Sequence, residues 1–373
     1  MKMKTLAIIL CAVAVVATVI VFISRRRGGE GGIYSLYIGG YGNAAVKCVF
    51  NAKSLECSIN RDFKAKNPSY LLTVSSPKRV YGVSESGSSS GVWGYVNNSL
   101  DQSLGQVKDG GADACYLAFF NNHLFTAGYG RGCLGVYPLD TAGRIMPACQ
   151  VVNFPSEGSV SRLHMVKVLT VPQTGNNYLL VTDKGCDRVY SLRITEGERG
   201  LRLASCDSSY ITVPKGYGPR HMAFSKNGKY MYLLCETSGK ILVYSVKEVE
   251  GNIILKQIQE EVSDKSAAGA SADIHLSPDG KFLYSSNRRG KDGIAIFKTR
   301  EDGTIKRIAY QVTLQWPRSF AISPDGDFLF VACQKDKTLQ IFRRDKSSGF
   351  LSNTGKTVSF PDLEPSCVLV RSY

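Results

Sequence analysis

The chain contains the stretch Trp316-Pro-Arg-Ser-Phe-Ala-Ile-Ser-Pro-Asp-Gly-Asp-Phe-Leu-Phe330, and two close copies of it begin at Gly218 and Ser271. Each copy reads as an alternating strand, a tight Asp-Gly or Asn-Gly turn, and a second strand rich in aromatic and branched residues. Weaker copies extend the series to seven, at intervals of roughly 50 residues. The equivalent positions are Ser69, Cys115, His164, Arg220, Ala272, Arg318 and Ser366. Short strands repeated at this period predict an all-β fold, a seven-bladed β-propeller.

Both ends of the repeat series are incomplete, and the two ends complement each other. The last copy stops after one strand, residues 364–373, whereas residues 33–41 read as a second strand without a first. The simplest arrangement pairs these segments, with the C-terminal strand innermost in the final blade and the N-terminal segment supplying its other three strands. Closure of this kind leaves no open sheet edge.

We therefore expect one propeller domain over residues 33–373, preceded by a separate segment, residues 1–32. Leu6 to Ile23 is an uncharged apolar run with lysines before it and three arginines after it. Its length suits a helix that spans a bilayer, which predicts a single-pass membrane anchor followed by a basic flank and a short glycine-rich tether. A cleaved signal peptide, and hence secretion, is the alternative. Basic residues on both sides leave the side of the membrane open.

The charge and cysteine content narrow the classes of partner. A net charge of +15 over 373 residues favours anionic partners, such as a small molecule or an acidic membrane surface. No nucleic-acid-binding module is present, so a nucleic-acid partner is not expected. The 11 cysteines form no Cys-x-x-Cys pair, and no motif indicates a metal or another cofactor. Cys48 and Cys57 could face each other across a hairpin, so a disulfide there stays open.

Candidate site residues follow from the geometry of the repeat. The first residues of the innermost strands converge at one end of the propeller axis, and a second ring of positions lies just past the second strand of each blade. The second ring contains Tyr41, Glu85, Tyr129, Asp183, Glu236, Arg288 and Gln334. Packing alone would place similar residues at equivalent positions, but these differ in charge from blade to blade. Distinct ionisable groups that converge on one place are suited to acid–base chemistry on an anion.

From the two rings we select His164, Arg220, Glu236 and Arg288 as catalytic candidates. The candidates for substrate binding are Arg318, Asp183, Glu85, Tyr129 and Gln334. Structural interpretations stand beside these: an inter-blade ion pair between Glu236 and Arg288, a structural histidine at position 164, and an arginine at 318 that holds a loop carbonyl. His221 alternates to the opposite side of its strand, which indicates a packing role.

At these motifs the sequence resembles the seven-bladed lactonase family, which includes propeller-type 6-phosphogluconolactonases and fungal 3-carboxy-cis,cis-muconate lactonizing enzymes. The matching stretches are Asn67-Pro-Ser-Tyr-Leu71, Asp183-Lys-Gly-Cys-Asp-Arg-Val-Tyr190, Gly218-Pro-Arg-His221 followed by Glu236, Ser277-Pro-Asp-Gly-Lys-Phe-Leu-Tyr-Ser-Ser-Asn-Arg288, and Trp316-Pro-Arg-Ser-Phe-Ala-Ile322. The resemblance covers essentially all of residues 33–373 and implies the same propeller fold.

The resemblance also implies a catalytic set. In the lactonizing branch the roles belong to one His, two Arg and one Glu, which fall here on the four catalytic candidates. Two departures are visible. The family usually has His-x-His where this chain has Arg162-Leu-His164, and an Ala-Glu pair becomes Ala272-Asp273, with His275 where Arg is common.

Three functions are consistent with these observations. The leading hypothesis is a lactonase-like hydrolase of an anionic sugar lactone of the 6-phosphogluconolactone type, which needs no cofactor. The second is a muconate-type lactonizing isomerase, in which the same arginines would bind carboxylates. The third is a non-catalytic, membrane-tethered propeller that binds a partner. The sequence does not determine the oligomeric state.

Overall fold

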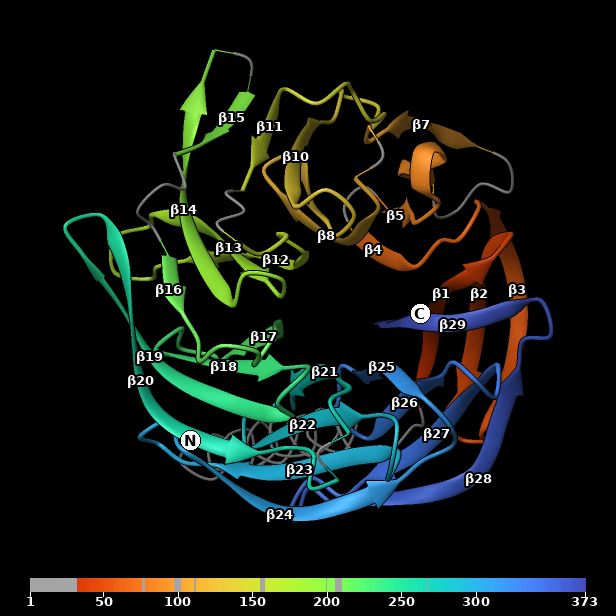
Figure 1. Ribbon diagram of the computed structural model, residues 1–373. Coiled ribbons are helices and arrows are strands. Elements are labelled where there is room, and N and C mark those ends of the chain that lie inside the picture. Colours follow the sequence, from red (N-terminus) through yellow and green to blue (C-terminus); the bar gives the residue numbers. More distant parts are fainter. Residues whose placement is uncertain are drawn as a thin grey trace, which may run out of the picture.

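The computed structural model describes residues 32–373 except 76–77, 97–101, 111, 155–157, 199, 205–209 and 267. Its strands form seven antiparallel sheets arranged around a central axis, as the ring of arrows in Figure 1 shows. Six sheets have four strands and one has five. The single helical element in the described part of the chain is a short 3-10 turn, η1 (Gly87–Ser89). The predicted all-β propeller with seven blades is confirmed.

The blades are numbered along the chain, and their strands are given in chain order. Blade 1 contains β4 (Tyr70–Ser75), β5 (Lys78–Ser84), β6 (Gly91–Val96) and β7 (Ser103–Lys108). Blade 2 contains β8 (Ala114–Phe120), β9 (His123–Gly128), β10 (Cys133–Pro138) and β11 (Gln150–Asn153). Blade 3 contains β12 (Leu163–Thr170), β13 (Asn177–Asp183), β14 (Arg188–Gly197), β15 (Gly200–Leu203) and β16 (Tyr210–Thr212). Blade 4 contains β17 (Pro219–Phe224), β18 (Tyr230–Cys235), β19 (Lys240–Val249) and β20 (Asn252–Val262). Blade 5 contains β21 (Ser271–Leu276), β22 (Phe282–Asn287), β23 (Gly293–Thr299) and β24 (Ile305–Val312). Blade 6 contains β25 (Pro317–Ile322), β26 (Phe328–Cys333), β27 (Thr338–Arg344) and β28 (Leu351–Ser359). Blade 7 contains β1 (Ile33–Gly42), β2 (Ala44–Asn51), β3 (Glu56–Lys64) and β29 (Leu363–Ser372).

The Asp-Gly and Asn-Gly turns of the repeat connect the first two strands of blades 4, 5 and 6. In each turn the glycine has a left-handed backbone, with φ of +69° at Gly228, +75° at Gly280 and +79° at Gly326. In blade 5 the Gly280 amide donates to the Ser277 carbonyl at 2.8 Å, which closes the turn. A residue with a Cβ is strained at such a φ, so the glycine explains why the turn recurs at this place.

The ring closes as the sequence predicts. In blade 7 the strand order is β29-β1-β2-β3, so the last strand of the chain lies innermost beside the first three. Leu36 of β1 lies opposite Val370 of β29 on one side and Cys48 of β2 on the other. Figure 1 shows β29 crossing toward the axis from β1 and β2. The two ends of the propeller therefore depend on each other for a complete sheet.

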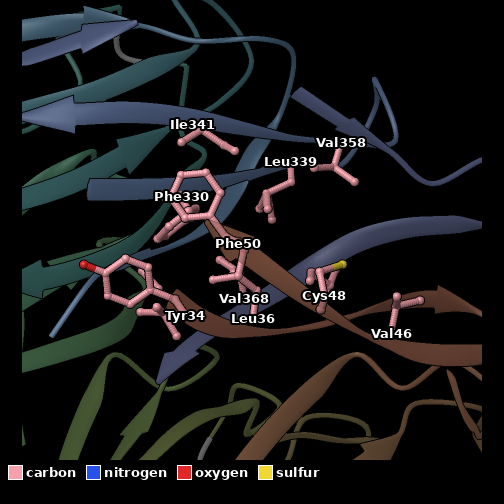
Figure 2. Close-up of a cluster of buried hydrophobic side chains, with 14 of the residues drawn as sticks. Tyr34, Leu36, Val46, Cys48, Phe50, Phe330, Leu339, Ile341, Val358 and Val368 are labelled. Atoms are coloured by element: carbon pink, nitrogen blue, oxygen red, sulfur yellow. The ribbon is translucent and has the colours of Figure 1, made fainter. Parts of the chain in front are cut away.

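The hydrophobic core is divided into seven clusters, and each one fills the space between two neighbouring blades. Figure 2 shows the cluster between blades 6 and 7, where Tyr34 and Phe50 pack against Phe330. The Phe50 and Phe330 rings meet edge to face, with centroids 5.1 Å apart. Because each blade buries its faces against both neighbours, no blade has a complete core of its own.

The predicted anchor or signal segment, residues 1–32, lies outside the described residues except for its last one, so it stays a prediction. Within the part that is described, no helix is long and apolar enough to cross a membrane. Cys48 and Cys57 lie on adjacent strands and are both free thiols in the structure. The hairpin thus brings them near each other as expected, without the disulfide.

Candidate active site

In six of the seven blades the innermost strand carries an irregularity at the predicted site position, the exception being Ser69, which precedes the regular strand β4 of blade 1. The strand pairing skips Cys115 in β8, His164 in β12, Arg220 in β17 and Arg318 in β25. Ala272 and Ser366 are skipped in the same way in β21 and β29. A β-bulge leaves one residue out of the ladder and re-aims its side chain, and bulges are frequent next to active sites. Six of the seven inner-ring positions predicted from the repeat are thus bulges.

The predicted second ring also lies where expected, directly after the second strand of its blade. Glu236 follows β18 and Arg288 follows β22. Because Pro219 pairs with Cys235, Arg220 and Glu236 lie beside each other at the same end of blade 4. The two rings therefore meet at one end of the propeller axis.

Glu236 is surrounded by cations from three blades, a group that we call the Glu236 cluster. Its Oε2 lies 2.9 Å from Nε of Arg220, and its Oε1 lies 3.0 Å from Nζ of Lys184 and 3.5 Å from Nη2 of Arg288. Blade 3 supplies Lys184, blade 4 supplies Arg220 and Glu236, and blade 5 supplies Arg288. The ion pair of Glu236 with Arg288 that the structural interpretation expects is present, and Arg220 adds a second one.

Both arginines of the cluster are buried and held by backbone carbonyls of blade 5. Arg288 Nε donates to the Ala270 carbonyl at 2.9 Å, and its guanidinium lies 5.7 Å from the centre of the Trp316 ring. Arg220 Nη1 donates to the carbonyl of Ala272. Anchored in this way, the two planar guanidinium groups have little freedom to reorient, which suits recognition of an oxyanion.

The cluster carries an excess of positive charge. Burial alone would raise the pKa of Glu236, but Arg220, Arg288 and Lys184 lower it to about 2, so the carboxylate stays ionised. Burial and the neighbouring Arg220 lower the pKa of Arg288 to about 9, which leaves this group charged at neutral pH. Three cations therefore share one carboxylate, and the site favours a further anion.

His164 lies beside this cluster as a neutral imidazole. Its ring is 7% exposed and contacts the rings of Tyr129 and His221 edge to face, with centroids at 5.7 and 5.1 Å. Burial, and then the positive charge of Arg220, hold the pKa of His164 well below its usual range. Nδ1 of His164 has no hydrogen-bond partner within the described residues. That nitrogen is buried, and the neutral imidazole as a whole can accept a proton.

A second polar network runs across blades 6, 7 and 1 at the same axial end. Arg318 Nη2 donates to the Tyr41 hydroxyl at 3.0 Å, and this hydroxyl donates to Glu85 Oε2 at 3.0 Å. Gln334 accepts from Arg318 at 3.5 Å and donates to Glu364 at 3.1 Å. The structure thus brings Arg318, Glu85 and Gln334 together, and Arg318 binds side chains rather than the loop carbonyl of the structural interpretation.

Asp183 takes a different place from the other substrate-binding candidates. It is fully buried, and its carboxylate accepts from the Ser161 hydroxyl at 2.6 Å and from the backbone amides of Arg162, Gly185 and Cys186 at 2.8 to 3.1 Å. These contacts use the carboxylate to tie the loop that follows β13 to the segment that precedes β12. Asp183 therefore has a structural role next to Lys184, and its substrate-binding role stays a prediction.

Lys184 and His221 are the two site residues that the repeat alignment did not select. Lys184 follows a selected position, inside the stretch Asp183 to Tyr190 that carries the family resemblance. His221 was expected on the opposite side of its strand from Arg220, but the bulge at Arg220 breaks the strict alternation. Its ring therefore reaches His164, while its Nδ1 lies 2.9 Å from Asp273 Oδ1.

The described residues contain no group of three or more His, Cys, Asp or Glu side chains that could hold a metal ion. What the arrangement offers instead is a set of fixed cations, one ionised carboxylate and one neutral imidazole. These groups can bind an oxyanion, stabilise a second one that develops during a reaction, and move a proton.

Comparisons with known proteins identify the family of the chain. The family described as "Lactonase, 7-bladed beta-propeller" matches residues 35–370. The chain belongs to this lactonase family. A 6-phosphogluconolactonase from Formosa agariphila is 32% identical over 320 residues, which cover 81% of this chain and 88% of that protein. A 6-phosphogluconolactonase from Bacillus subtilis is 26% identical, with 92% of this chain and 95% of that protein covered.

Solved structures of lactonase-family propellers show the same architecture. One from Bacteroides fragilis, proposed to be a 6-phosphogluconolactonase, has a TM-score of 0.83 at 32% identity and covers 91% of this chain and 98% of its own. The periplasmic gluconolactonase of Pseudomonas aeruginosa has a TM-score of 0.80 at 26% identity, with 91% and 99% covered. The lactonase-family resemblance of the repeat motifs is therefore confirmed over the whole propeller.

Proposed function

We propose that this lactonase-family propeller hydrolyses an anionic sugar lactone of the 6-phosphogluconolactone type. The observation that carries the proposal is the Glu236 cluster, in which Lys184, Arg220 and Arg288 exceed the single carboxylate in charge, next to a neutral His164. Relatives named 6-phosphogluconolactonase and gluconolactonase support the same class of substrate.

Binding would draw on both polar groups at this end of the axis. The cations of the Glu236 cluster would pair with the phosphate or carboxylate oxygens of the substrate, since guanidinium groups match them with two parallel hydrogen bonds. The network of Tyr41, Glu85 and Gln334 offers hydroxyl and carboxylate oxygens and an amide, which are suited to sugar hydroxyls.

Hydrolysis requires a water molecule to attack the lactone carbonyl carbon while the ring C–O bond breaks. The His164 imidazole would accept the proton of that water and return it to the ring oxygen, which leaves as a hydroxyl. An arginine of the cluster would stabilise the negative oxygen that develops on the carbonyl. The product is a hydroxy acid, which releases one proton at neutral pH.

The low pKa of His164 fits this role once the substrate is bound. Part of the depression comes from Arg220, Arg318 and Lys184. An anion that pairs with these cations offsets their effect, so the imidazole becomes a stronger base in the complex than in the free protein. Substrates with a phosphate should therefore react faster than neutral ones at the same pH.

A pH-stat assay of freshly prepared 6-phosphogluconolactone tests the proposal, because each opened lactone releases one proton. We expect the wild-type protein to exceed spontaneous opening, and His164→Gln and Glu236→Gln to lower kcat/KM by about 100-fold or more. Lys184→Met should raise KM for the phosphorylated lactone more than for unphosphorylated gluconolactone. Lys229→Met, an exposed lysine in the turn of blade 4, is the matched control and should leave both parameters unchanged.

Wild-type protein that does not exceed spontaneous opening for either lactone would refute the proposal. Turnover of a muconate-type diacid, followed through the absorbance of its diene, would instead favour the lactonizing isomerase. Folded protein that turns over neither class and binds a partner would favour the non-catalytic module.

We also propose that residues 1–32 attach the propeller to a membrane. The support is the apolar run from Leu6 to Ile23 with its basic flanks. Retention of the whole protein in the membrane fraction after an alkaline wash is the expected result, and recovery of a shortened soluble chain would show cleavage of a signal peptide instead.

A further inference from the structure

Trp316 has a backbone conformation that large aromatic residues rarely adopt. Its φ is +64°, in the left-handed region where a side chain is strained. The Trp316 amide donates to Asp292 Oδ2 at 2.5 Å, and its carbonyl accepts from the Gln334 amide at 3.0 Å, so the surrounding loops impose this backbone. Strain at a residue other than glycine is a reason to look for a function of its side chain.

The repeat shows which residues are sufficient at this position. Two residues before the inner-ring position, blades 1, 2 and 4 have Asn67, Asp113 and Gly218, and all three have a positive φ. In each of these blades the carbonyl of this residue accepts from the amide of the second-ring residue, at 2.7 to 3.1 Å. Asparagine, aspartate and glycine tolerate the left-handed region better than tryptophan does. The recurring hydrogen bond explains the backbone, but it does not explain a tryptophan.

Apolar packing does not explain the indole either. Among the described residues, the seven apolar clusters between the blades do not include Trp316. Its ring instead lies close to cations. The guanidinium carbons of Arg288 and Arg289 lie 5.7 and 5.4 Å from the ring centre, and Lys335 Nζ lies 5.7 Å from it. The face of an indole attracts cations. These four residues are called the Trp316 cluster below.

The equivalent place between blades 3 and 4 is filled differently. Gly218 there corresponds to position 316, and Lys184 corresponds to position 289. A Cβ on Gly218 would lie 3.4 Å from Lys184 Cγ, so the lysine passes over a residue without a side chain and reaches Glu236 at 3.0 Å. In blade 6 an indole fills this place, and the second-ring residue is the neutral Gln334. The cation from the preceding blade therefore finds a ring where Lys184 finds a carboxylate.

Arg289 and Lys335 consequently keep their charges uncompensated. Both side chains are exposed, and neither forms an ion pair with a described residue. The acids of the same two loops, Asp292 and Asp336, accept backbone amides at 2.5 and 2.6 Å. Two exposed cations beside one partly buried ring match a dianion such as a phosphate monoester, and guanidinium groups bind phosphate oxygens with two parallel hydrogen bonds.

An anionic lactone needs an anion site of this kind. Its carboxyl group is an ester until the ring opens, so its charge belongs to another part of the molecule. That charge has to be held beside the groups that act on the carbonyl, and not on them. Arg288 connects the two places, because its Nη2 lies 3.5 Å from Glu236 Oε1 while its guanidinium lies near the Trp316 ring.

We propose that Arg288, Arg289 and Lys335, gathered around the Trp316 ring, bind the phosphate of a phosphosugar lactone and select it over the unphosphorylated sugar. This inference rests on the proposed function and adds the direction of the substrate. The phosphate lies at the junction of blades 5 and 6, and the lactone ring points toward the Glu236 cluster. Trp316 acts as a positioning residue for the cations.

Tryptophan fluorescence of the full-length protein tests binding without turnover. The chain has 2 tryptophans, and Trp93 is only 3% exposed, so a ligand at the Trp316 cluster acts on the other one. We expect 6-phosphogluconate to change the signal in a saturable manner, and gluconate to bind about tenfold more weakly or worse. In Arg289→Gln/Lys335→Gln the half-saturating concentration of 6-phosphogluconate should rise by about tenfold or more. Lys306→Gln, which removes one exposed lysine at the start of the outer strand β24, is the matched control and should bind like the wild type.

The variant Trp316→Asn separates the backbone of this residue from its side chain. Asparagine is the residue of blade 1 at this position, so the variant should fold, which thermal unfolding would show. In the pH-stat assay, its kcat/KM for 6-phosphogluconolactone relative to that for gluconolactone should fall by about tenfold or more.

Equal affinity of the wild type for gluconate and 6-phosphogluconate would overturn the proposal. Undiminished binding of 6-phosphogluconate in Arg289→Gln/Lys335→Gln, or an unchanged ratio of kcat/KM in folded Trp316→Asn, would overturn it as well. Failure of the proposed function gives a different result: the wild type would prefer 6-phosphogluconate in the fluorescence assay and still not exceed spontaneous opening of either lactone. The phosphate site would then stand without the hydrolase.

Discussion

Glu236 holds together positive side chains that would otherwise repel one another. Arg220 and Arg288 are each nearly inaccessible to solvent, and both depend on this carboxylate for compensation. Removal of one partner from a buried ion pair leaves the other charge uncompensated, which is more damaging than loss of an exposed pair. The residue that assembles the site therefore also stabilises the contact between blades 3, 4 and 5.

Buried neutral histidines make the stability of the propeller depend on pH. Burial and the charge of Arg220 lower the pKa of His221 to about 4, against an ordinary value of 6.5, although Asp273 opposes the shift. Between these values the unfolded chain binds more protons than the folded one, so stability is lost as the pH falls from 6.5 toward 4. We expect the free energy of unfolding to fall by about 2 kcal/mol from pH 7 to pH 5 because of His221 alone.

Urea denaturation at several pH values measures this effect. His164 has a lowered pKa for the same reason and acts in the same direction. Glu236, with a pKa of about 2 against an ordinary 4.5, loses its contribution only below pH 4.5 and does not interfere in this window. His221→Gln should show a shallower dependence than the wild type, and a wild-type free energy that is constant from pH 7 to pH 5 would contradict the interpretation.

At the residue scale, the sequence predicts which positions converge but not how their side chains connect. The repeat register was sufficient to select Arg220, Glu236 and Arg288, because equivalent positions meet at the axis by symmetry. It could not show that Asp183 turns into its own loop while Lys184 reaches Glu236. That outcome depends on two backbone amides of the loop after β13 and on the Arg162 amide just before β12, which come together only when the blade folds.

At the scale of elements, the bulges in the innermost strands are what turn a structural repeat into a site. The pairing of β12, β17 and β25 skips His164, Arg220 and Arg318 in turn, so these side chains leave the regular in-and-out alternation. Strand alternation read from sequence assumes no bulge, so it could not show that the buried His221 ring contacts His164. Strands, turns and blade order follow from the period of the sequence, whereas a bulge leaves no clear signal in it.

The turn between β21 and β22 gives a direct prediction for an element. Gly280 has φ of +75°, and a Cβ there would meet nothing closer than Lys226 Cδ at 3.6 Å, so only backbone strain opposes a side chain. Gly280→Ala should lower the free energy of unfolding by about 1–2 kcal/mol. Chemical denaturation measures the loss, and Gly280→Asn is the matched control, because asparagine tolerates this backbone region better than alanine. Equal stability of Gly280→Ala and the wild type would show that the turn can change its geometry.

At the scale of the whole molecule, the closure of blade 7 makes the last strand essential. Removal of residues 363–373 would strip β29 from β1 and expose the apolar cluster between blades 6 and 7, which includes Leu363, Val368 and Val370. We expect such a truncation to abolish cooperative folding, since each blade depends on both neighbours.

Circular dichroism during thermal unfolding and limited proteolysis measure this effect. Removal of Tyr373 alone is the control, because β29 ends at Ser372 and the Tyr373 side chain is 74% exposed. A truncated chain that still unfolds in one sharp transition would mean that six blades and an open sheet are sufficient.

Blade 7 also constrains how the protein is made. Synthesis runs from the N-terminus, so β1, β2 and β3 leave the ribosome before the other six blades, while their inner neighbour β29 is made only after those blades. Throughout translation the backbone of β1 keeps a row of unpaired amides and carbonyls, which is a template for another chain to pair with. Nascent propellers on one messenger can therefore trap each other, and chaperones that shield this edge should matter most until β29 has been made.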